Sequence, residues 1–408
     1  NGMTKIGFSS SFDDEDMERL TLIIKNPEMT DVPALADVSL TTVVARAMLW
    51  DFDVIELNSD TRGHPVAVMG FYLVCRFGLF DSLPLERDVV RSLLLAIEAS
   101  YAPHSFHNKC HAADVAQAFG YFMAIFKDSL SPIEKLAGII AALAHDMEHT
   151  ATTNSYHQNT DSDLALLHND RSVLENHHLV ALFTLLKDPS KNILAPLSRT
   201  LRREFRRVVL EMVFATDLAS GFEVIGSFTT MFNDQLKAEH GKVTDWPALL
   251  DSSAKRLVVL KMALKCADLS HPARRLSTHE RNALALREEF LNQGDAEKAA
   301  GLTPLAFMDR SVDNPFSKTQ VNFFEFVVLP MWEPFNKLLN LPACWDNIQQ
   351  NLRHWEAMET LEPAPTSPPR AATVAPTVIQ RRCPPAPAPT VPTFAQCNPV
   401  PLNHPTLN

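Results

Sequence analysis

Histidine residues concentrate in one part of this sequence. Nine of the 15 histidines lie between positions 104 and 178, although this stretch is less than a fifth of the 408 residues. Imidazole is a common metal ligand and a proton carrier near neutral pH. Histidines used only for packing would be spread along the chain, so we expect this stretch to bind a metal or to transfer protons.

Two histidines near the start of this stretch are spaced for a shared site. His107 and His111 are four residues apart. On a helix this spacing puts both imidazoles on one face. The spacing alone is a weak signal, because two surface or capping histidines have it just as easily.

A second group of ionisable residues follows an apolar segment. His145 and Asp146 come directly after the apolar residues 137–144, so both emerge from a helix that we expect to be buried. A buried charge without a partner is costly, which indicates a metal or a paired network nearby. A His-Asp pair in this place is typical of metal-dependent phosphohydrolases.

One more carboxylate ends another apolar helix. Asp268 follows the apolar segment 257–264, and alone it would be interpreted as an ordinary helix-end carboxylate. Two imidazoles and two carboxylates together suit Zn²⁺ with coordination positions left open for water. The residues of this predicted metal site are His111, His145, Asp146 and Asp268.

Helices are the elements expected to position these groups. Apolar side chains recur at three- and four-residue steps from about residue 88 to residue 360, including helices over 202–214 and 254–268. Ser131, Pro132 and Glu134 combine a cap, a first-turn proline and an acid at one helix start. Only 12 glycines are present, which disfavours barrels, sandwiches and glycine-rich nucleotide loops. We therefore predict an all-α fold that forms a compact, multi-helix catalytic domain.

Composition divides the chain into three regions. Residues 1–30 are weakly patterned, residues 31–360 form the predicted helical catalytic domain, and residues 361–408 hold 13 of the 28 prolines. Proline removes backbone donors and fixes φ, so we expect the last region to be an extended, disordered tail. The first residues carry no secretory signal and resemble an internal part of a longer protein, so regulatory domains are expected outside this sequence.

Charge and cysteine content exclude several classes of protein. The chain has 37 basic and 48 acidic residues, and its net charge of −11 argues against a nucleic-acid-binding surface. No apolar run reaches the roughly 18 residues of a transmembrane helix. The six cysteines include no C-x-x-C pair, which indicates a reducing compartment. We therefore expect a cytoplasmic protein that acts on a small molecule.

Seven motifs follow one another along the chain. They are HNKCHAADVAQ at 107–117, HDMEH at 145–149, NDRSVLENHH at 169–178, ATDL at 215–218, CADLS at 266–270, TQVNFF at 319–324 and LPMW at 329–332. In this order they resemble one enzyme family, the class I 3′,5′-cyclic nucleotide phosphodiesterases. The resemblance runs from about residue 100 to residue 356, and it is greatest to members of the kinetoplastid type.

The resemblance implies a binuclear metal site. His111, His145, Asp146 and Asp268 match the ligands of a tightly bound zinc, and Asp146 also matches the bridge to a weaker second ion, Mg²⁺ or Mn²⁺. Residues that match those holding the second ion's waters are His149, Glu175 and Thr216, and Asp217 matches a motif position with an indirect role. His107 matches the general acid, and Glu175 is expected to orient its imidazole.

The resemblance also implies a pocket for the purine base. Gln320 matches a glutamine that hydrogen-bonds the base edge, Phe323 matches a phenylalanine that stacks on the base, and Leu286 matches the opposing aliphatic residue. We expect Phe324 to pack in the core instead. His271 stands where many adenosine-selective members have asparagine, so the choice between cyclic AMP and cyclic GMP stays open.

These residues suffice for phosphodiester hydrolysis. Two ions about 4 Å apart can hold a bridging hydroxide as nucleophile and draw charge from the phosphate. An imidazolium at His107 can protonate the leaving 3′ oxygen, giving a nucleoside 5′-monophosphate and ending a cyclic-nucleotide signal.

Three alternatives from other classes remain. An HD-type nucleotide phosphohydrolase would share the His-Asp centre but would have no use for Gln320 and Phe323. A catalytically silent cyclic-nucleotide sensor would not need a proton donor at His107. A purely structural helical protein would leave the histidine cluster unexplained.

Overall fold

The computed structural model describes residues 46–237 and 243–361, and within these two ranges it contains helices and no strand. This confirms the predicted all-α class. The expected weakly ordered segment 1–30 and residues 362–408 of the expected tail lie outside the described residues. None of the described helices combines the length and apolarity that a membrane crossing requires.

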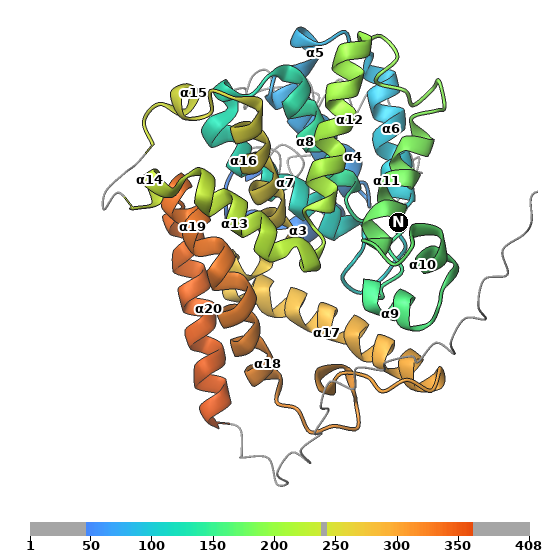
Figure 1. Cartoon of the computed structure of the whole chain (residues 1–408), viewed down its shortest axis with the longest axis vertical. Coiled ribbons are helices and arrows are strands. Elements are labelled where there is room, and N and C mark those ends of the chain that lie inside the picture. The colour runs from blue at the N-terminus through green and yellow to red at the C-terminus, as the bar shows by residue number, and fades with distance from the viewer. Residues whose placement is uncertain (1–45, 238–242, 362–408) are drawn as a thin grey trace, which may run out of the picture. The chain divides into compact units, whose positions relative to one another are not determined.

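The first half of the described chain forms most of one helical bundle (Figure 1). Helices α12 and α8 share the largest contact, and α7 packs against α4, α8 and α16. The helices of this half are α3 (Val54–Asp60), α4 (Pro65–Arg76), α5 (Leu79–Ser82), α6 (Arg87–Ala99), α7 (Lys109–Phe126), α8 (Pro132–Ala144), α9 (Asn154–Asn159), α10 (Asp163–His168), α11 (Val173–Leu185) and α12 (Arg199–Phe214).

The second half completes the bundle with α16 and adds a group of helices that lie together in the lower part of Figure 1. In this group α18 packs along α20, and α17 contacts α20. The helices of this half are α13 (Gly221–Met231), α14 (Asn233–Lys237), α15 (Trp246–Leu249), α16 (Ser253–Asp268), α17 (Leu276–Ala299), α18 (Phe316–Phe323), the π-helix η5 (Phe324–Val328), α19 (Leu329–Leu339) and α20 (Pro342–Leu361).

Local sequence explains where α8 begins and ends. The hydroxyl of Ser131 accepts from the Glu134 backbone N–H, and the Glu134 carboxylate accepts from the Ser131 backbone N–H, which satisfies donors that a helix start leaves open. Arg256 of α16 forms an ion pair with Glu134 at 2.8 Å. The helix is buried along almost its whole length and ends at Ala144, so His145 is its C-cap and Asp146 follows. The two ionisable residues therefore leave the core together, as the sequence predicted.

A glycine allows α8 to approach α7 closely. A Cβ atom at Gly138 would lie 2.6 Å from the Phe119 ring of α7, well inside van der Waals contact. Both helices bring candidate metal ligands into one site, since α7 carries His111 and α8 ends at His145. The glycine thus fixes the separation of two helices that must bring their ligands together.

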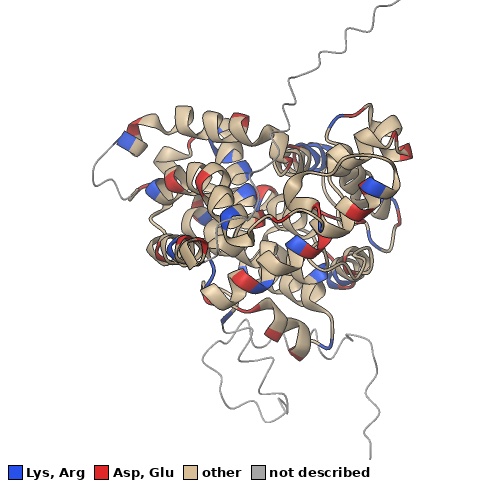
Figure 2. Ribbon diagram, turned by 90° about the horizontal axis from the view of Figure 1, so that it is seen from below, with Lys and Arg blue, Asp and Glu red and all other residues tan. Residues whose placement is uncertain are grey.

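Buried polar contacts join the two halves of the described chain. Arg274 hydrogen-bonds to the Trp50 carbonyl and forms an ion pair with Asp114 of α7 at 2.8 Å. Phe324 is fully buried, as expected, in the core that α18 and α19 share. Basic and acidic residues are mixed over the ribbon seen in this view and do not separate into large regions of one sign (Figure 2).

Candidate active site

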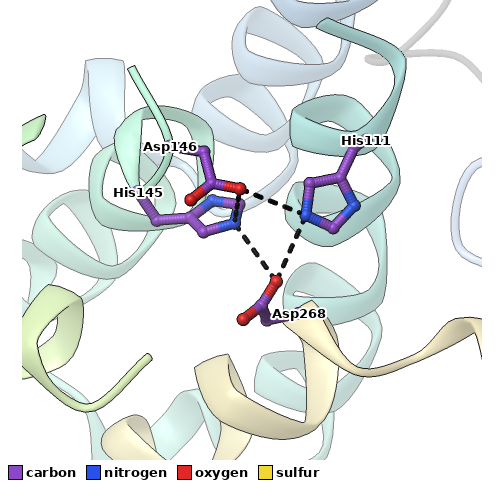
Figure 3. Close-up of side chains that lie close together, drawn as sticks. All are labelled: His111, His145, Asp146 and Asp268. Carbon is purple, nitrogen blue, oxygen red and sulfur yellow. Dashed lines mark hydrogen bonds and ion pairs between the residues drawn. The ribbon is translucent and has the colours of Figure 1, made fainter. Parts of the chain in front are cut away.

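Four side chains from three helix ends converge on one point (Figure 3). His111 Nε2 lies 3.2 Å from Asp268 Oδ1 and 3.5 Å from Asp146 Oδ2. His145 Nε2 lies 3.2 Å from Asp146 Oδ2 and 3.3 Å from Asp268 Oδ1. Ligand atoms that share one ion at about 2.0–2.2 Å are separated by roughly 3 Å or slightly more, so this arrangement fits a single metal.

The hydrogen bonds of His145 leave its other nitrogen free for a metal. His145 Nδ1 donates to the Ala142 carbonyl at 2.9 Å, while the buried Nε2 has no hydrogen-bond partner. A histidine that donates from one nitrogen to a backbone carbonyl presents a lone pair on the other, which is the usual state of a metal-bound imidazole. The residues present therefore fit a bound cation.

The pKa values of the two histidines also indicate that this site favours positive charge. Burial alone would lower the pKa of His111, but its hydrogen bonds to Asp146 and Asp268 raise that pKa to about 9. Burial is likewise outweighed at His145, where the charge of Asp146 holds the pKa well above the usual range. Two ionised carboxylates thus need cations beside them, and a metal would replace the protons that the imidazoles otherwise hold.

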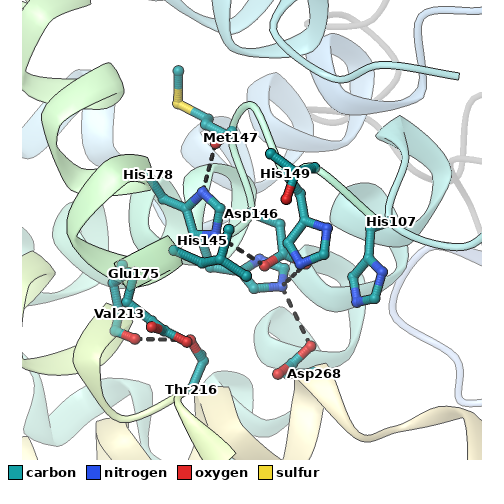
Figure 4. Close-up of polar contacts among 12 residues, drawn as sticks. His107, His145, Asp146, Met147, His149, Glu175, His178, Val213, Thr216 and Asp268 are labelled. Carbon is teal, nitrogen blue, oxygen red and sulfur yellow. Dashed lines mark hydrogen bonds and ion pairs between the residues drawn. The ribbon is translucent and has the colours of Figure 1, made fainter. Parts of the chain in front are cut away.

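Asp146 also takes part in a second group of possible ligands. One ligand atom from each of Asp146, His149 and His178 lies within 4.8 Å of the others. His178 Nδ1 donates to the Met147 carbonyl at 2.5 Å, so its Nε2 is free and lies 3.6 Å from Asp146 Oδ1 (Figure 4). The two carboxylate oxygens of Asp146 therefore face two different groups, which suits a residue that bridges two ions.

His107 is oriented by a residue that the sequence motifs did not indicate. Helix α7 begins only at Lys109, so His107 lies in the turn before the helix, although its ring centre is still 5.8 Å from that of His111. His107 Nδ1 donates to Glu289 Oε2 at 2.5 Å, and the backbone N–H of His107 donates to Glu289 Oε1 at 2.9 Å. Glu289 therefore fixes both the ring and the backbone of His107.

The prediction that Glu175 orients His107 is wrong. The Glu175 carboxylate instead accepts from the Asn154 side chain at 2.9 Å, on the opposite side of the group that contains Asp146 (Figure 4). Burial, together with the charge of Asp217, raises the pKa of Glu175 to about 7. At Glu289 burial would raise the pKa, but the hydrogen bond from His107 outweighs it and lowers the pKa. Glu289 is thus the ionised partner of the imidazole.

A buried lysine holds the segment that carries Thr216 and Asp217. Lys265 Nζ donates to the carbonyls of Ala215, Thr216 and Asp217 at 2.9–3.3 Å. The Thr216 hydroxyl donates to the Val213 carbonyl, which leaves its oxygen lone pairs free, and Asp217 accepts from Ser172 at 2.7 Å. The ammonium group therefore satisfies the carbonyls of the three residues that directly follow α12.

A cavity of about 1790 Å³ joins these groups to the predicted base pocket. Gln320 and Phe323 are three residues apart on α18, and Leu286 and Glu289 are three residues apart on α17, so each pair lies on one side of its helix. The predicted residues that line this cavity are His107, Asp146, His149, Glu175, Thr216, Asp217, Asp268, His271, Leu286, Gln320 and Phe323. His111 and His145 are buried behind them and complete the ligand group.

Two polar atoms of the base pocket have no partner within the described chain. Gln320 Oε1 and His271 Nε2 are both buried and make no hydrogen bond. Leaving such groups unpaired is costly, so they indicate a ligand with polar edges. The Phe323 ring lies nearly parallel to His271, with ring centres 5.9 Å apart and an angle of 8°.

The sequence analysis predicted no site role for Glu289 or His178. His178 lies inside the NDRSVLENHH motif, where its proximity to Glu175 was the signal that could have found it. Glu289 lies in no motif and is 182 residues away from His107. Only the fold brings Glu289 to the site.

Comparison with known proteins identifies a family to which this chain is similar. A family model described as 3′5′-cyclic nucleotide phosphodiesterase matches residues 106–350. The high affinity cAMP-specific and IBMX-insensitive 3′,5′-cyclic phosphodiesterase 8A of Homo sapiens is 32% identical over 366 residues, which cover 85% of this chain and 44% of that protein.

Two further comparisons agree. The dual specificity calcium/calmodulin-dependent 3′,5′-cyclic nucleotide phosphodiesterase 1 of Drosophila melanogaster is 36% identical over 72% of this chain and 34% of its own length. The phosphodiesterase domain of the RhoPDE fusion protein from Salpingoeca rosetta has a TM-score of 0.69 at 27% identity, covering 77% of this chain and 96% of that domain. This chain spans less than half the length of the two curated relatives.

Proposed function

The chain belongs to the 3′,5′-cyclic nucleotide phosphodiesterase family, and from that premise we propose that its cavity hydrolyses 3′,5′-cyclic nucleotides to nucleoside 5′-monophosphates. One observation carries the proposal: a single cavity adjoins the metal-ligand group and contains the His107–Glu289 pair and the unpaired polar atoms of a base pocket. An HD-type phosphohydrolase would need the first of these features but not the last.

The proposed metals are a tightly held Zn²⁺ and a second ion, Mg²⁺ or Mn²⁺. His111, His145, Asp146 and Asp268 would hold the first, and Asp146 would face the second with His149, His178, Glu175 and Thr216 around it. When bound, the two ions supply an activated water as nucleophile and withdraw charge from the phosphate.

His107 is the proposed general acid. Glu289 accepts from Nδ1 of its ring, so the proton for the substrate is carried on Nε2, the ring's other nitrogen. Glu289 holds the ring in place, and His107 would deliver its Nε2 proton to the leaving 3′ oxygen. His149 stacks on the His107 ring with centres 3.9 Å apart and limits its rotation.

The base is proposed to lie against Phe323, with Leu286 opposite and Gln320 at its edge. The Gln320 amide has one acceptor and two donors, and rotation exchanges them, so it can pair with adenine or with guanine. One relative is described as cAMP-specific and another as having dual specificity, which supports both nucleotides as candidate substrates. We propose that this chain accepts both.

The same chemistry supports a role in ending cyclic-nucleotide signals inside the cell. Cys110, Cys266 and Cys344 are free thiols, which supports a reducing compartment such as the cytoplasm. One of the longer relatives is described as calcium/calmodulin-dependent, so regulation by segments beyond the described catalytic unit is also part of the proposal.

Hydrolysis assays test this proposal directly. Purified protein is assayed on cyclic AMP, cyclic GMP and a panel of nucleoside triphosphates, before chelation, after chelation and after return of Zn²⁺ and Mg²⁺. We expect hydrolysis of the cyclic nucleotides alone, lost on chelation and restored by the metals. Cleavage of the triphosphates without cleavage of the cyclic nucleotides would favour the HD-type reaction.

A further inference from the structure

A buried glutamine of α17 holds the short segment that precedes α9. Gln293 Oε1 accepts from the Thr153 backbone N–H at 2.9 Å, and Gln293 Nε2 donates to the Thr153 hydroxyl at 3.1 Å. Nε2 also donates to Glu297 Oε1 at 2.8 Å. Gln293 is only 3% exposed, so water does not compete for these bonds. The amide therefore joins α17 to a residue that lies 140 positions away in the sequence.

The segment held in this way has an unfavourable local conformation. Glu148 and Ala151 have φ angles of 58° and 56°, in the left-handed region that residues other than glycine rarely adopt. Contacts from outside the segment must offset this cost. Thr153 is also the N-cap of α9, because its hydroxyl accepts from the Tyr156 backbone N–H at 3.2 Å. Gln293 thus fixes the point at which α9 begins.

The first residue of α9 extends this anchoring to Glu175. Asn154 Nδ2 donates to Glu175 Oε2 at 2.9 Å, and Asn154 Oδ1 accepts from the Leu174 backbone N–H at 2.9 Å. A backbone N–H can only donate, so these partners decide which end of the amide faces the carboxylate. The Asn154 side chain therefore holds both the first turn of α11 and the carboxylate that this turn carries.

Helix α11 depends on Asn154 because its own N-cap is engaged elsewhere. Ser172 makes no side-chain hydrogen bond to the start of α11. Its hydroxyl donates instead to Asp217 at 2.7 Å. The Leu174 N–H is one of the donors that the start of a helix leaves open, and Asn154 supplies its acceptor.

We propose that Asn154 and Gln293 are positioning residues that raise the affinity of the second ion site by holding Glu175 in place. The inference rests on the proposed function, in which Glu175 lies around the second ion. Glu175 lines the same cavity as Asp146, the residue shared by the two candidate ligand groups. A glutamate side chain that is ordered before the ion binds loses less conformational entropy on binding than a free one.

Substitution of the asparagine tests the contact with Glu175 directly. Mn²⁺ serves as the probe for the second site, and its binding to the zinc-loaded full chain is measured by electron paramagnetic resonance without substrate. We expect the Kd for Mn²⁺ to rise about 10–100-fold in Asn154→Ala, the usual effect of losing a partner of a residue at a metal site. Asn176→Ala is the matched control, because the Asn176 amide next to Glu175 donates only to the carbonyls of Arg171 and Ser172. Its Kd should equal that of the unmodified protein.

Substitution of the glutamine tests the anchor at a greater distance. Gln293→Leu keeps the approximate size of the side chain and leaves the contacts of Asn154 with α11 in place, so it also decides the question if Asn154→Ala fails to fold. We expect its Kd for Mn²⁺ to rise about three- to tenfold, the worth of one hydrogen bond. Asn292→Ala, at the exposed neighbouring position that accepts from Arg310, should leave the Kd unchanged.

A purely structural role for these amides would give a different result. General loosening of the site would release zinc and Mn²⁺ to the same extent, whereas the positioning role leaves the zinc content unchanged. Equal loss of both metals, or an unchanged Kd for Mn²⁺ in the folded variants, overturns the inference. Absence of cyclic-nucleotide hydrolysis by the unmodified protein overturns the proposed function instead, because Mn²⁺ binding is measured independently of turnover.

Discussion

Asp146 is the residue that connects the two candidate ion sites. Its Oδ2 atom lies in the group with His111 and His145, and its Oδ1 atom lies 3.6 Å from His178. A carboxylate shared in this way cannot be replaced by water at one site without loss at the other. Asp268 belongs to one of the two candidate ligand groups only. Loss of Asp146 would therefore affect both groups, whereas loss of Asp268 would affect one.

Removal of either carboxylate should abolish hydrolysis. We expect Asp146→Ala and Asp268→Ala to lose activity because each removes a metal ligand and leaves buried imidazoles without their counter-charge. Elemental analysis should find about one tightly held zinc in the unmodified protein and much less in both variants, whereas the exposed control Asp128→Ala should match the unmodified protein. Near-normal turnover in Asp268→Ala would contradict the assignment.

Substitution of His107 should slow chemistry without weakening substrate binding. We expect His107→Asn to lower kcat by roughly 10²–10⁴, the usual worth of a positioned proton donor. Glu289→Gln keeps the size of the side chain and removes the charge beside Nδ1, so its loss should be smaller, roughly 10–100-fold. Both losses should shrink on a nitrophenyl ester, whose leaving group needs no proton. Equal losses on both substrates would argue against a general acid.

The raised pKa of Glu175 gives a prediction about pH. The folded-state pKa is about 7 against an ordinary value of 4.5, so stability falls as pH rises through this interval, because the folded site disfavours the ionised form. In chelator-treated protein, Glu175→Gln should therefore raise stability relative to the unmodified protein at pH 8 and leave it nearly unchanged at pH 4.5. Urea denaturation at the two pH values checks this, and an equal gain at both would show that the charge is not the cause.

At the scale of elements, helix packing fixes the separation of the candidate metal ligands. We expect Gly138→Ala to destabilise the protein, because the added methyl group meets the Phe119 ring at 2.6 Å and overpacking costs about 1–3 kcal/mol. Gly226→Ala, on exposed α13 with nothing within 4 Å of the new Cβ, should instead stabilise by up to about 1 kcal/mol. Thermal denaturation of the two variants gives the comparison, and a gain in both would mean that α7 and α8 can separate freely.

The elements also explain which site residues a sequence can predict. His145, Asp146 and Asp268 each come at or directly after the end of an apolar helix, so local pattern alone marks them as emerging from the core. Glu289 has no such mark. The neighbouring residue Glu288 is also a glutamate, but its carboxylate forms an exposed ion pair with Arg310. Only the packing of α17 against the turn before α7 distinguishes the two glutamates.

Long-range contacts set the same limit for the base pocket. Gln320 and Phe323 were predicted from a motif, yet the hydrogen bond between His279 and Trp355 spans 76 residues and depends on where α20 packs. The sequence left the tautomer of His271 open, because a histidine taken alone can donate or accept. In the packed structure the ring of His271 lies 3.0 Å from that of His279, which in turn accepts from the Trp355 indole.

At the scale of the whole molecule, every proposed site residue lies between residues 107 and 323. We therefore expect a chain that ends after Glu362 to retain its kcat and KM on cyclic nucleotides and to keep nearly the same thermal midpoint. Activity assays and calorimetry on the shortened and full chains make the comparison. A large loss in the shortened chain would show that the Pro-rich region supports the catalytic unit.

Helix α17 contributes Leu286 to the base pocket and Glu289 to the His107 pair, about 4.5 Å apart along one rigid axis. A displacement of this helix would therefore move both side chains together. We therefore expect a bulky inhibitor that displaces Leu286 together with α17 to move the Glu289 carboxylate away from His107 as well, and so to weaken the proposed proton donor without contacting it. Enlarging the proposed base pocket would then also slow cleavage of the phosphodiester bond.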